Sequence, residues 1–498
     1  MTNDHRFWIS KYLLGLTMNK NWTLGSIFEA LKIQPPINLP HIPISKIEIR
    51  PKECTPGSLF IPDNFHLRSS GYLNEEDAIK TAIAHGASAA ITSLDHLPFK
   101  TAIPVLKFRH PTSIIAALAK KARSEYKGKT IAITGSVGKT STKDVIAATL
   151  ENRGSIYKTI DSGNAIAGVC QTIINTPNNA NFCVVEVGVS RPGHMAHAAY
   201  AKPDIGIITN IGLSHLMNYK NKNELFKEKI SIFDHLSGMQ VGIIHESILE
   251  EKIGTTYLAQ KTLSRLIKVG NSSASDIYCS NYNFFGTRTE GVISVFQKKF
   301  PFLLQLPSPH FIPCALFAVA CSVALDLDVE GCLGALGSIQ ITSHRFERSK
   351  ITLPDGHMEL IDDSCNAAPA SMKALLEVLS QRKAKRKVLV WGDMLELGEH
   401  SNIYHNEIAM LANLADLDLL ITVGTQTKSA SMSVLTAAVI NYDNWEEASL
   451  NSIDQFRCGD LIAVKASAAI KLTNVVDKIK TLGVCTPAER WSIENDDL

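Results

Sequence analysis

The 498-residue chain lacks the features that mark several large classes of protein. Its ten cysteines include no CxxC pair, so neither a zinc site nor a disulfide framework is indicated, and a reducing cytoplasm fits. The net charge of +2 gives no electrostatic case for a nucleic-acid partner or an acidic membrane surface. No apolar run approaches the roughly 20 residues that span a bilayer. We therefore expect a cytoplasmic protein that neither binds nucleic acid nor inserts into a membrane.

The N-terminal segment also lacks the features of a signal peptide. The stretch MTNDHRFWISKYLLGLTMNK carries charges of both signs and has no long apolar core or small-residue cleavage site. We interpret residues 1–20 as an extension, with Met18 as an alternative start to Met1.

A chain of this length exceeds one hydrophobic core, and its apolar patterns predict three α/β units. The predicted units are residues 1–108, 109–342 and 343–498, with the first linker near Arg109 to Pro111. In the second and third units, strand patterns such as FCVVEVGV and KVLVWG alternate with helical patterns. This alternation predicts mostly parallel sheets that helices cover on both faces.

The stretch TIAITGSVGKTSTK, from Thr130 to Lys143, has the pattern of a phosphate-binding loop: a short apolar strand, a glycine turn and a helix. The amides of such a turn and the helix N-terminus point at one anion. Lys139 would reach the terminal phosphates, and the Thr140 hydroxyl would bind Mg²⁺. The predicted phosphate-binding residues are Gly135, Ser136, Val137, Gly138, Lys139, Thr140 and Ser141. The alternative is a glycine turn with a solvated lysine.

Two polar residues follow predicted strands of the second unit. Glu186 ends the apolar strand that begins at Phe182, at the same sheet edge as the phosphate loop, where a second Mg²⁺ ligand is needed. His215 follows the strand in DIGIITNIG and is a candidate for metal or phosphate contact. The alternatives are a glutamate in solvent and a structural histidine.

Two basic residues are unremarkable on pattern alone. Lys229 lies in NELFKEKISIFDHL, whose apolar residues recur at helical spacing, and by itself it reads as a solvated helix lysine. Arg345 begins the third unit, where a planar cation at a domain joint could clamp a γ-phosphate.

Several strings resemble the Mur ligases, the ATP-dependent amide ligases of peptidoglycan synthesis. They are TGSVGKTSTK, VVEVGVSRPGHM, PDIGIITNIGLSHL, DDSCNAAPASMKALL and WGDMLELGEHSNIYHNEIA. The last two are most similar to the branch that adds D-Ala-D-Ala to a UDP-muramoyl tripeptide. The resemblance implies an N-terminal UDP-substrate domain, a central P-loop ATPase domain with a parallel sheet and a C-terminal Rossmann-like ligase domain.

The resemblance also implies roles for single residues. Lys139, Lys229, His215 and Arg345 match residues with catalytic roles. Thr140, Glu186 and His215 match metal ligands, and Lys229 matches the lysine whose carbamate binds the second Mg²⁺.

Three residues match the nucleotide site of the family. Arg345 resembles the arginine that contacts phosphate, Asp363 the residue that holds the ATP ribose, and His310 the histidine of the family's GxHNxxN motif. The implied reaction forms an acyl phosphate from ATP and a UDP-muramoyl peptide, which an incoming amine then attacks. The implied cofactors are ATP, two Mg²⁺ ions and a carbamylated lysine, in a protein that acts as a monomer.

Several positions depart from the family's pattern. GxHNxxN reads SPHFIPC, with Phe311 and Cys314 in place of the asparagines that face adenine. NLNNEIG is shortened to GNAIAG, YNANP reads CNAAP, KGSR reads KASA, and DSR reads EIR. Two explanations stay open: a divergent peptidoglycan ligase, or a paralogue that joins a different amine to a different acid. A non-catalytic nucleotide-binding protein is a third reading, which the retained phosphate and metal residues disfavour.

Overall fold

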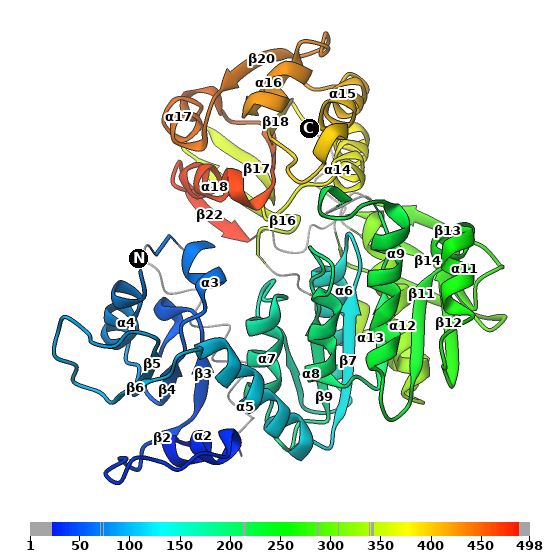
Figure 1. Ribbon diagram of the computed structural model, residues 1–498. Coiled ribbons are helices and arrows are strands. Elements are labelled where there is room, and N and C mark those ends of the chain that lie inside the picture. Colours follow the sequence, from blue (N-terminus) through cyan, green and yellow to red (C-terminus); the bar gives the residue numbers. More distant parts are fainter. Residues whose placement is uncertain are drawn as a thin grey trace.

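The computed structural model describes residues 22–487, apart from 70, 73, 213–215, 286, 287, 307, 338 and 340–342. The predicted extension, with Met1 and Met18, lies outside the described residues. The described chain forms three α/β units, each built around its own sheet (Figure 1).

The first unit is built on a small parallel sheet with strand order β3-β4-β5-β6. Its first helix begins after Thr23, whose side chain accepts a hydrogen bond from the Ser26 amide and caps the helix. Its elements are β1 (Trp22–Thr23), α2 (Leu24–Leu31), β2 (Pro43–Ile44), β3 (Lys46–Glu48), η1 (Pro51–Glu53), β4 (Ser58–Phe60), α3 (Asn64–Ser69), α4 (Glu75–Ala84), β5 (Ala89–Thr92) and β6 (Val105–Lys107).

The second unit has a nine-stranded sheet with the order β15-β14-β13-β12-β11-β10-β7-β9-β8. Its first half contains α5 (Pro111–Glu125), β7 (Lys129–Thr134), α6 (Lys139–Glu151), β8 (Ile156–Lys158), α7 (Ile166–Asn175), β9 (Phe182–Glu186), η2 (His194–His197), α8 (Ala198–Ala201) and β10 (Ile205–Ile208). Its second half contains η3 (Leu216–Asn218), α9 (Lys222–Ile230), η4 (Ser231–His235), β11 (Val241–His245), α10 (Ser247–Glu250), α11 (Lys252–Leu258), β12 (Arg265–Gly270), β13 (Ile277–Phe284), β14 (Thr289–Val295), β15 (Lys298–Leu304), η5 (Pro309–Phe311), α12 (Ile312–Ala324) and α13 (Val329–Leu336).

Helices cover both faces of this sheet. Ile131 and Ile133 of β7 pack into the same core as α6 and α12, whereas Ala132 between them packs into the core of α5 and α7. Successive side chains of a strand point to opposite faces, so β7 is buried on both sides. Because β7 lies between β10 and β9, its carboxyl end opens at the middle of the sheet.

The sheet also has an edge that the sequence patterns did not predict. Strands β13, β14 and β15 pair antiparallel beyond the parallel strands. Along β15, buried residues such as Phe302 and Leu304 alternate with exposed ones, which is typical of a strand with one face in solvent. The expectation of a mostly parallel sheet is therefore confirmed, with β14 and β15 as an antiparallel edge that the patterns did not predict.

The third unit has a seven-stranded sheet with the order β20-β19-β18-β21-β17-β16-β22, in which β16 and β22 run antiparallel. Its strands are β16 (Glu347–Leu353), β17 (Gly356–Asp363), β18 (Arg386–Gly392), β19 (Leu419–Val423), β20 (Ala438–Tyr442), β21 (Asp460–Lys465) and β22 (Val484–Pro487). Its helices are α14 (Pro369–Gln381), η6 (Gly398–His400), α15 (Ser401–Ala412), α16 (Thr425–Ser431), α17 (Trp445–Asn451), η7 (Ile453–Gln455), η8 (Ala468–Ile470) and α18 (Thr473–Lys480).

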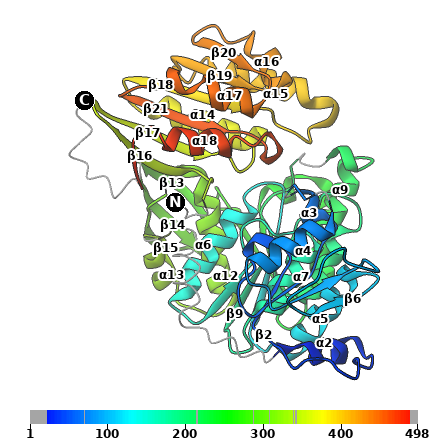
Figure 2. The same cartoon turned by 90° about the vertical axis from the view of Figure 1, so that its left-hand side faces the viewer.

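Buried hydrogen bonds join the first unit to α7 of the second. The side-chain amide of Asn175 accepts from the Ile47 amide at 2.9 Å and donates to the Ile47 carbonyl at 2.8 Å. Gln171 donates to the fully buried carboxylate of Glu48 at 2.8 Å. The third unit lies above the second in the view of Figure 2, with β16 at the junction between the two units. Among the described helices, none combines the length and apolar character needed to cross a membrane.

Candidate active site

The phosphate loop connects β7 to α6, as the sequence predicts. Gly135 has a φ of 150°, and a Cβ atom there would lie 1.9 Å from the Thr209 hydroxyl, so only glycine fits. Gly138 has a φ of 83° and immediately precedes Lys139, Thr140 and Ser141 in the first turn of α6. The loop therefore turns its amides and a helix N-terminus toward one point, which suits a phosphate.

Asn210 holds the loop in place from the neighbouring strand. Its side-chain oxygen accepts hydrogen bonds from the amides of Ser136 and Val137, at 3.2 and 3.0 Å. Its side-chain nitrogen donates to the Val137 carbonyl at 2.9 Å. The sequence analysis did not single out Asn210, although the residue lies in the string NIGLSHL.

Lys139 folds back onto the loop. Its Nζ donates to the Gly135 carbonyl at 2.8 Å and to the Ser136 carbonyl at 3.4 Å. Burial lowers the pKa of Lys139, and the Glu186 carboxylate partly offsets that effect. The ammonium therefore lies inside the loop, where terminal phosphates would arrive, and the reading of a fully solvated lysine does not hold.

Thr140 and Glu186 form a buried oxygen pair beside the loop. The Thr140 hydroxyl donates to Glu186 Oε2 at 2.7 Å, and Asn164 donates to Glu186 Oε1 at 2.8 Å. Glu186 is only 1% exposed, which rules out the reading of a solvated strand-end glutamate. A hydroxyl and a buried carboxylate are hard oxygen ligands, so these residues fit Mg²⁺.

Lys229 is fully buried on α9, in contrast to the solvated lysine that the pattern alone indicated. Its Nζ donates to the Ser136 hydroxyl at 3.1 Å. Burial, together with the nearby charge of Lys139, holds the pKa of Lys229 well below its usual value. The α9 side chain that faces the phosphate loop is therefore an amine that burial drives toward its neutral form.

His215 lies outside the described residues, so its predicted metal or phosphate contact stays a prediction. The other predicted nucleotide residues lie around the joint to the third unit. Arg345 Nη2 donates to the Ser162 hydroxyl at 2.8 Å, and that hydroxyl lies 3.5 Å from Thr140 Oγ1. Arg345 thus reaches from the third unit to the Thr140–Glu186 pair.

Asp363 ends β17 and forms an ion pair with the buried Lys465 at the end of β21. Burial raises the pKa of Asp363 despite that cation. The His310 ring centroid lies 4.6 Å from the Phe311 ring and 5.2 Å from the Phe346 ring. Phe311 and Cys314 are 3% and 5% exposed, so both are largely core side chains.

A loop of the third unit, which sequence reasoning quoted but did not interpret, also faces this site. Glu396 lies in it with a φ of 64°, and its charge acts on Lys139, where it raises the lysine pKa. The loop is anchored because Leu395 donates its amide to the Ser467 hydroxyl at 2.8 Å and Met394 donates its amide to His405 at 2.9 Å. The two glutamates in LELGEH are the sequence pattern from which an acidic loop near the site could have been predicted.

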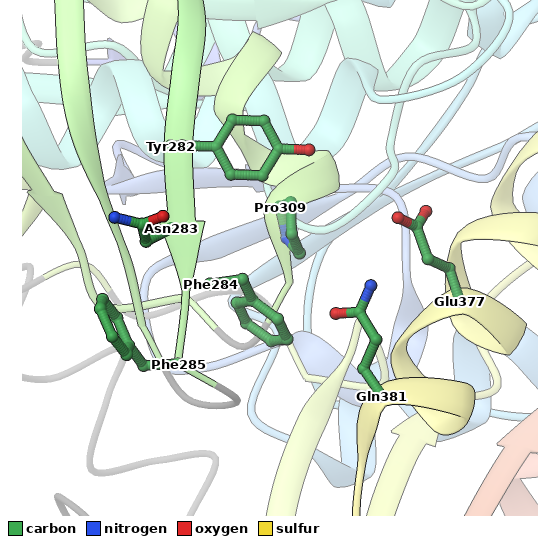
Figure 3. Close-up of a pocket in the computed structure, with 7 residues that line it drawn as sticks. All are labelled: Tyr282, Asn283, Phe284, Phe285, Pro309, Glu377 and Gln381. Atoms are coloured by element: carbon green, nitrogen blue, oxygen red, sulfur yellow. The ribbon is translucent and has the colours of Figure 1, made fainter.

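A pocket of about 430 Å³ lies between the β13 hairpin and α14 (Figure 3). Tyr282 points across it toward Glu377, and Gln381 lies one turn further along α14. Burial raises the pKa of Tyr282, and the Glu377 charge adds to that effect. The pocket thus pairs aromatic walls of the second unit with polar groups of the third, next to Pro309.

Known proteins are similar to this chain in sequence and in fold. Residues 133–322 match the Mur ligase middle domain, and residues 344–468 match the Mur ligase glutamate ligase domain. The UDP-N-acetylmuramoyl-tripeptide--D-alanyl-D-alanine ligase of Buchnera aphidicola subsp. Acyrthosiphon pisum is 30% identical over 387 residues, which are 76% of this chain and 81% of that protein.

Two solved structures are similar in fold. MurF from Acinetobacter baumannii has a TM-score of 0.73 at 21% identity and covers 92% of this chain and 99% of its own. The MurF ligase of Thermotoga maritima in complex with ADP has a TM-score of 0.69 at 21% identity and covers 88% of this chain and 97% of its own. The predicted three-domain fold is therefore confirmed, and the chain belongs to the Mur ligase family.

Proposed function

We propose that this protein is an ATP-dependent ligase that adds D-Ala-D-Ala to a UDP-N-acetylmuramoyl tripeptide. The observation that carries the proposal is the buried Thr140–Glu186 pair beside the Lys139 ammonium, a set suited to a nucleotide phosphate and a cation. The relatives that carry this name span most of the chain. As a protein acting on soluble nucleotides, it would work in the cytoplasm, and since one chain supplies all proposed site residues, it would work as a monomer.

In the proposed reaction, a carboxylate of the UDP-linked substrate attacks the γ-phosphoryl group of ATP and gives an acyl phosphate and ADP. The amine of the dipeptide then attacks the acyl carbon, loses a proton and expels phosphate as the amide forms. Phosphoryl transfer depends mainly on positioning and charge neutralisation. Lys139 from the second unit and Arg345 at the third would supply positive charge from two sides.

Thr140 and Glu186 would hold Mg²⁺, and His215 is the further ligand that we propose from the family resemblance. A bound Mg²⁺ would neutralise phosphate charge during the transfer. Asn164 keeps the Glu186 carboxylate oriented toward Thr140, through its 2.8 Å hydrogen bond to the other carboxylate oxygen.

Lys229 would bind the second Mg²⁺ as a carbamate. An ammonium cannot bind a cation, but a neutral amine that attacks the carbon of dissolved CO₂ and releases a proton becomes a carbamate anion. The full burial of Lys229 supports this proposal because burial favours the neutral amine that the reaction needs.

The third unit would present the amine. Its anchored loop carries Glu396 toward Lys139, and closing of this unit over the second would exclude water from the acyl phosphate. Asp363 would hold the ATP ribose, with Lys465 fixing its carboxylate.

Phosphate release from ATP tests the function directly. We expect release that requires both a UDP-N-acetylmuramoyl tripeptide and D-Ala-D-Ala, and a product with the mass of the pentapeptide. Release with single amino acids but not with the dipeptide would favour the second candidate, a paralogue with a different amine. The changed loops at GNAIAG and SPHFIPC are the observation behind that candidate.

A further inference from the structure

The backbone on both sides of Arg345 is left-handed. His344 has a φ of 63° and Phe346 a φ of 60°, a conformation that residues with a side chain rarely adopt. Such geometry persists only where surrounding contacts hold it, and it gathers at functional sites. The contacts that hold these two residues come from different units.

His344 is fixed to the third unit through three of its groups. Its Nδ1 lies 2.6 Å from Asp362 Oδ2, its amide donates to Glu347 Oε2 at 3.0 Å, and its carbonyl accepts from the Cys365 amide at 3.0 Å. Asp362 is fully buried, and its other oxygen accepts from the Ser364 amide and hydroxyl at 3.1 and 2.6 Å. His344 is therefore held against a carboxylate that cannot move easily.

Phe346 is fixed to the second unit. Its ring is 2% exposed and lies 5.2 Å from the His310 ring and 6.3 Å from the Phe311 ring, centroid to centroid. Between the two anchors, Arg345 donates one nitrogen to Ser162, while its buried Nε has no hydrogen-bond partner within the described chain. A buried donor without a partner costs free energy, so this guanidinium is suited to receive an anion.

We propose that the His344–Asp362 pair is a positioning element that aims Arg345 at the terminal phosphates of ATP. The inference rests on the proposed function, since it assumes that ATP binds at the phosphate loop. Asp363, the proposed ribose contact, is held separately by its ion pair with Lys465. His344 and Asp362 would act through Arg345 and not on the substrate itself.

In this pair, a protonated His344 ring faces the Asp362 carboxylate. The hydrogen bond to Asp362 raises the pKa of His344, although burial opposes that effect. Burial alone would raise the pKa of Asp362, but the His344 contact lowers it. The other charged groups that face the pair are Glu347 on β16 and Lys480 on α18, whose Nζ lies 2.9 Å from Glu347 Oε1 and 3.8 Å from Asp362 Oδ2. The pair is therefore intact below the raised pKa of His344 and weakens as the pH rises through it.

Calorimetric binding of ATP and AMP to His344→Gln tests the inference. We expect ATP affinity to fall about tenfold while AMP affinity stays unchanged, because only ATP carries the phosphates that Arg345 would contact. His357→Gln, a histidine of β17 outside the pair, is the matched control and should leave both affinities unchanged. Equal losses for ATP and AMP, or no loss in a folded variant, would overturn the inference.

A double-mutant cycle and a pH series complete the test. Asp362→Asn should cause the same selective loss, and the double variant should lose no more than either single variant, because the residues act as one unit. The ratio of ATP to AMP affinity of the wild type should fall as the pH rises above the usual histidine pKa of about 6.5, because the pKa of His344 is raised by its hydrogen bond to Asp362. This series needs no variant to fold, and a flat ratio contradicts the inference. Failure of the wild type to bind ATP at all would instead contradict the proposed function.

Discussion

At the scale of single residues, the phosphate-loop lysine should be required for turnover and dispensable for folding. Among the described residues, Lys139 Nζ bonds to carbonyls of the loop alone, so Lys139→Ala removes charge at the proposed phosphate position without opening the core. We expect more than a tenfold loss of ATP-dependent ligation at an unchanged melting temperature. Lys127→Ala, an exposed lysine just before β7, is the control. A tenth or more of wild-type turnover in Lys139→Ala would contradict the assignment of the loop.

Lys229 allows a chemical rescue experiment. If its carbamate binds a cation, Lys229→Ala should lose ligation, and high bicarbonate or a short-chain carboxylate should restore part of it by supplying an anion. Lys227→Ala on the exposed side of α9 should keep activity and show no response to these anions. Unchanged turnover of Lys229→Ala would mean that the buried amine has only a packing role.

Base selection should be weak if Phe311 and Cys314 define the base site. Neither side chain offers the paired donors and acceptors of an asparagine, and two neutral hydrogen bonds are worth only ~1–2 kcal/mol of discrimination. We therefore expect GTP to support ligation within about tenfold of ATP in side-by-side kinetics. A preference for ATP beyond a hundredfold would point to other polar groups, for which Glu377 and Gln381 in the pocket of Figure 3 are candidates.

At the scale of elements, the sequence was most informative where strands are buried on both faces. Strands β7 and β18 contain short apolar runs, and a glycine follows β7 and ends β18, so their positions and the phosphate loop could be predicted. The antiparallel edge of β13 to β15 was missed because the sequence analysis relied on continuous apolar runs, whereas these strands mix apolar with polar residues along their length. The burial of Lys229 was missed because a lysine on a helix is usually solvated, although Leu225 and Phe226, four and three residues before it, lie on the same buried face.

The loop that carries Glu396 should contribute to binding of the amine substrate and not to binding of ATP. The incoming dipeptide carries an ammonium, and Glu396 is a carboxylate on an anchored loop whose charge acts on Lys139. We expect Glu396→Gln to raise the KM for D-Ala-D-Ala at least fivefold while the KM for ATP changes little. Glu399→Gln, an exposed neighbour on η6, serves as the control. A rise in the KM for ATP alone would show that the carboxylate acts on the nucleotide side.

At the scale of the whole molecule, the buried contacts of Asn175 should join the first and second units into one cooperative structure. Asn175→Ala leaves the buried amide of Ile47 without its side-chain partner, which costs roughly 1–3 kcal/mol before water enters, whereas the Ile47 carbonyl keeps its 3.1 Å hydrogen bond from Gln171. We expect denaturant unfolding of the variant to begin earlier, with loss of the first unit before the second. Asn179→Ala, an exposed residue shortly after α7, should unfold like the wild type. A single unshifted transition in Asn175→Ala would contradict this coupling.

The short stretch 161–164 receives contacts from all three units. Arg50 of the first unit pairs with Asp161 at 2.8 Å, Arg345 at the third donates to Ser162 at 2.8 Å, and Asn164 orients the Glu186 carboxylate at 2.8 Å. A small molecule lodged against these four residues would thus disturb contacts from the first and third units and the proposed cation site together. Resistance to such an inhibitor would be hard to evolve, because a substitution that expels it would also disturb a contact that catalysis needs.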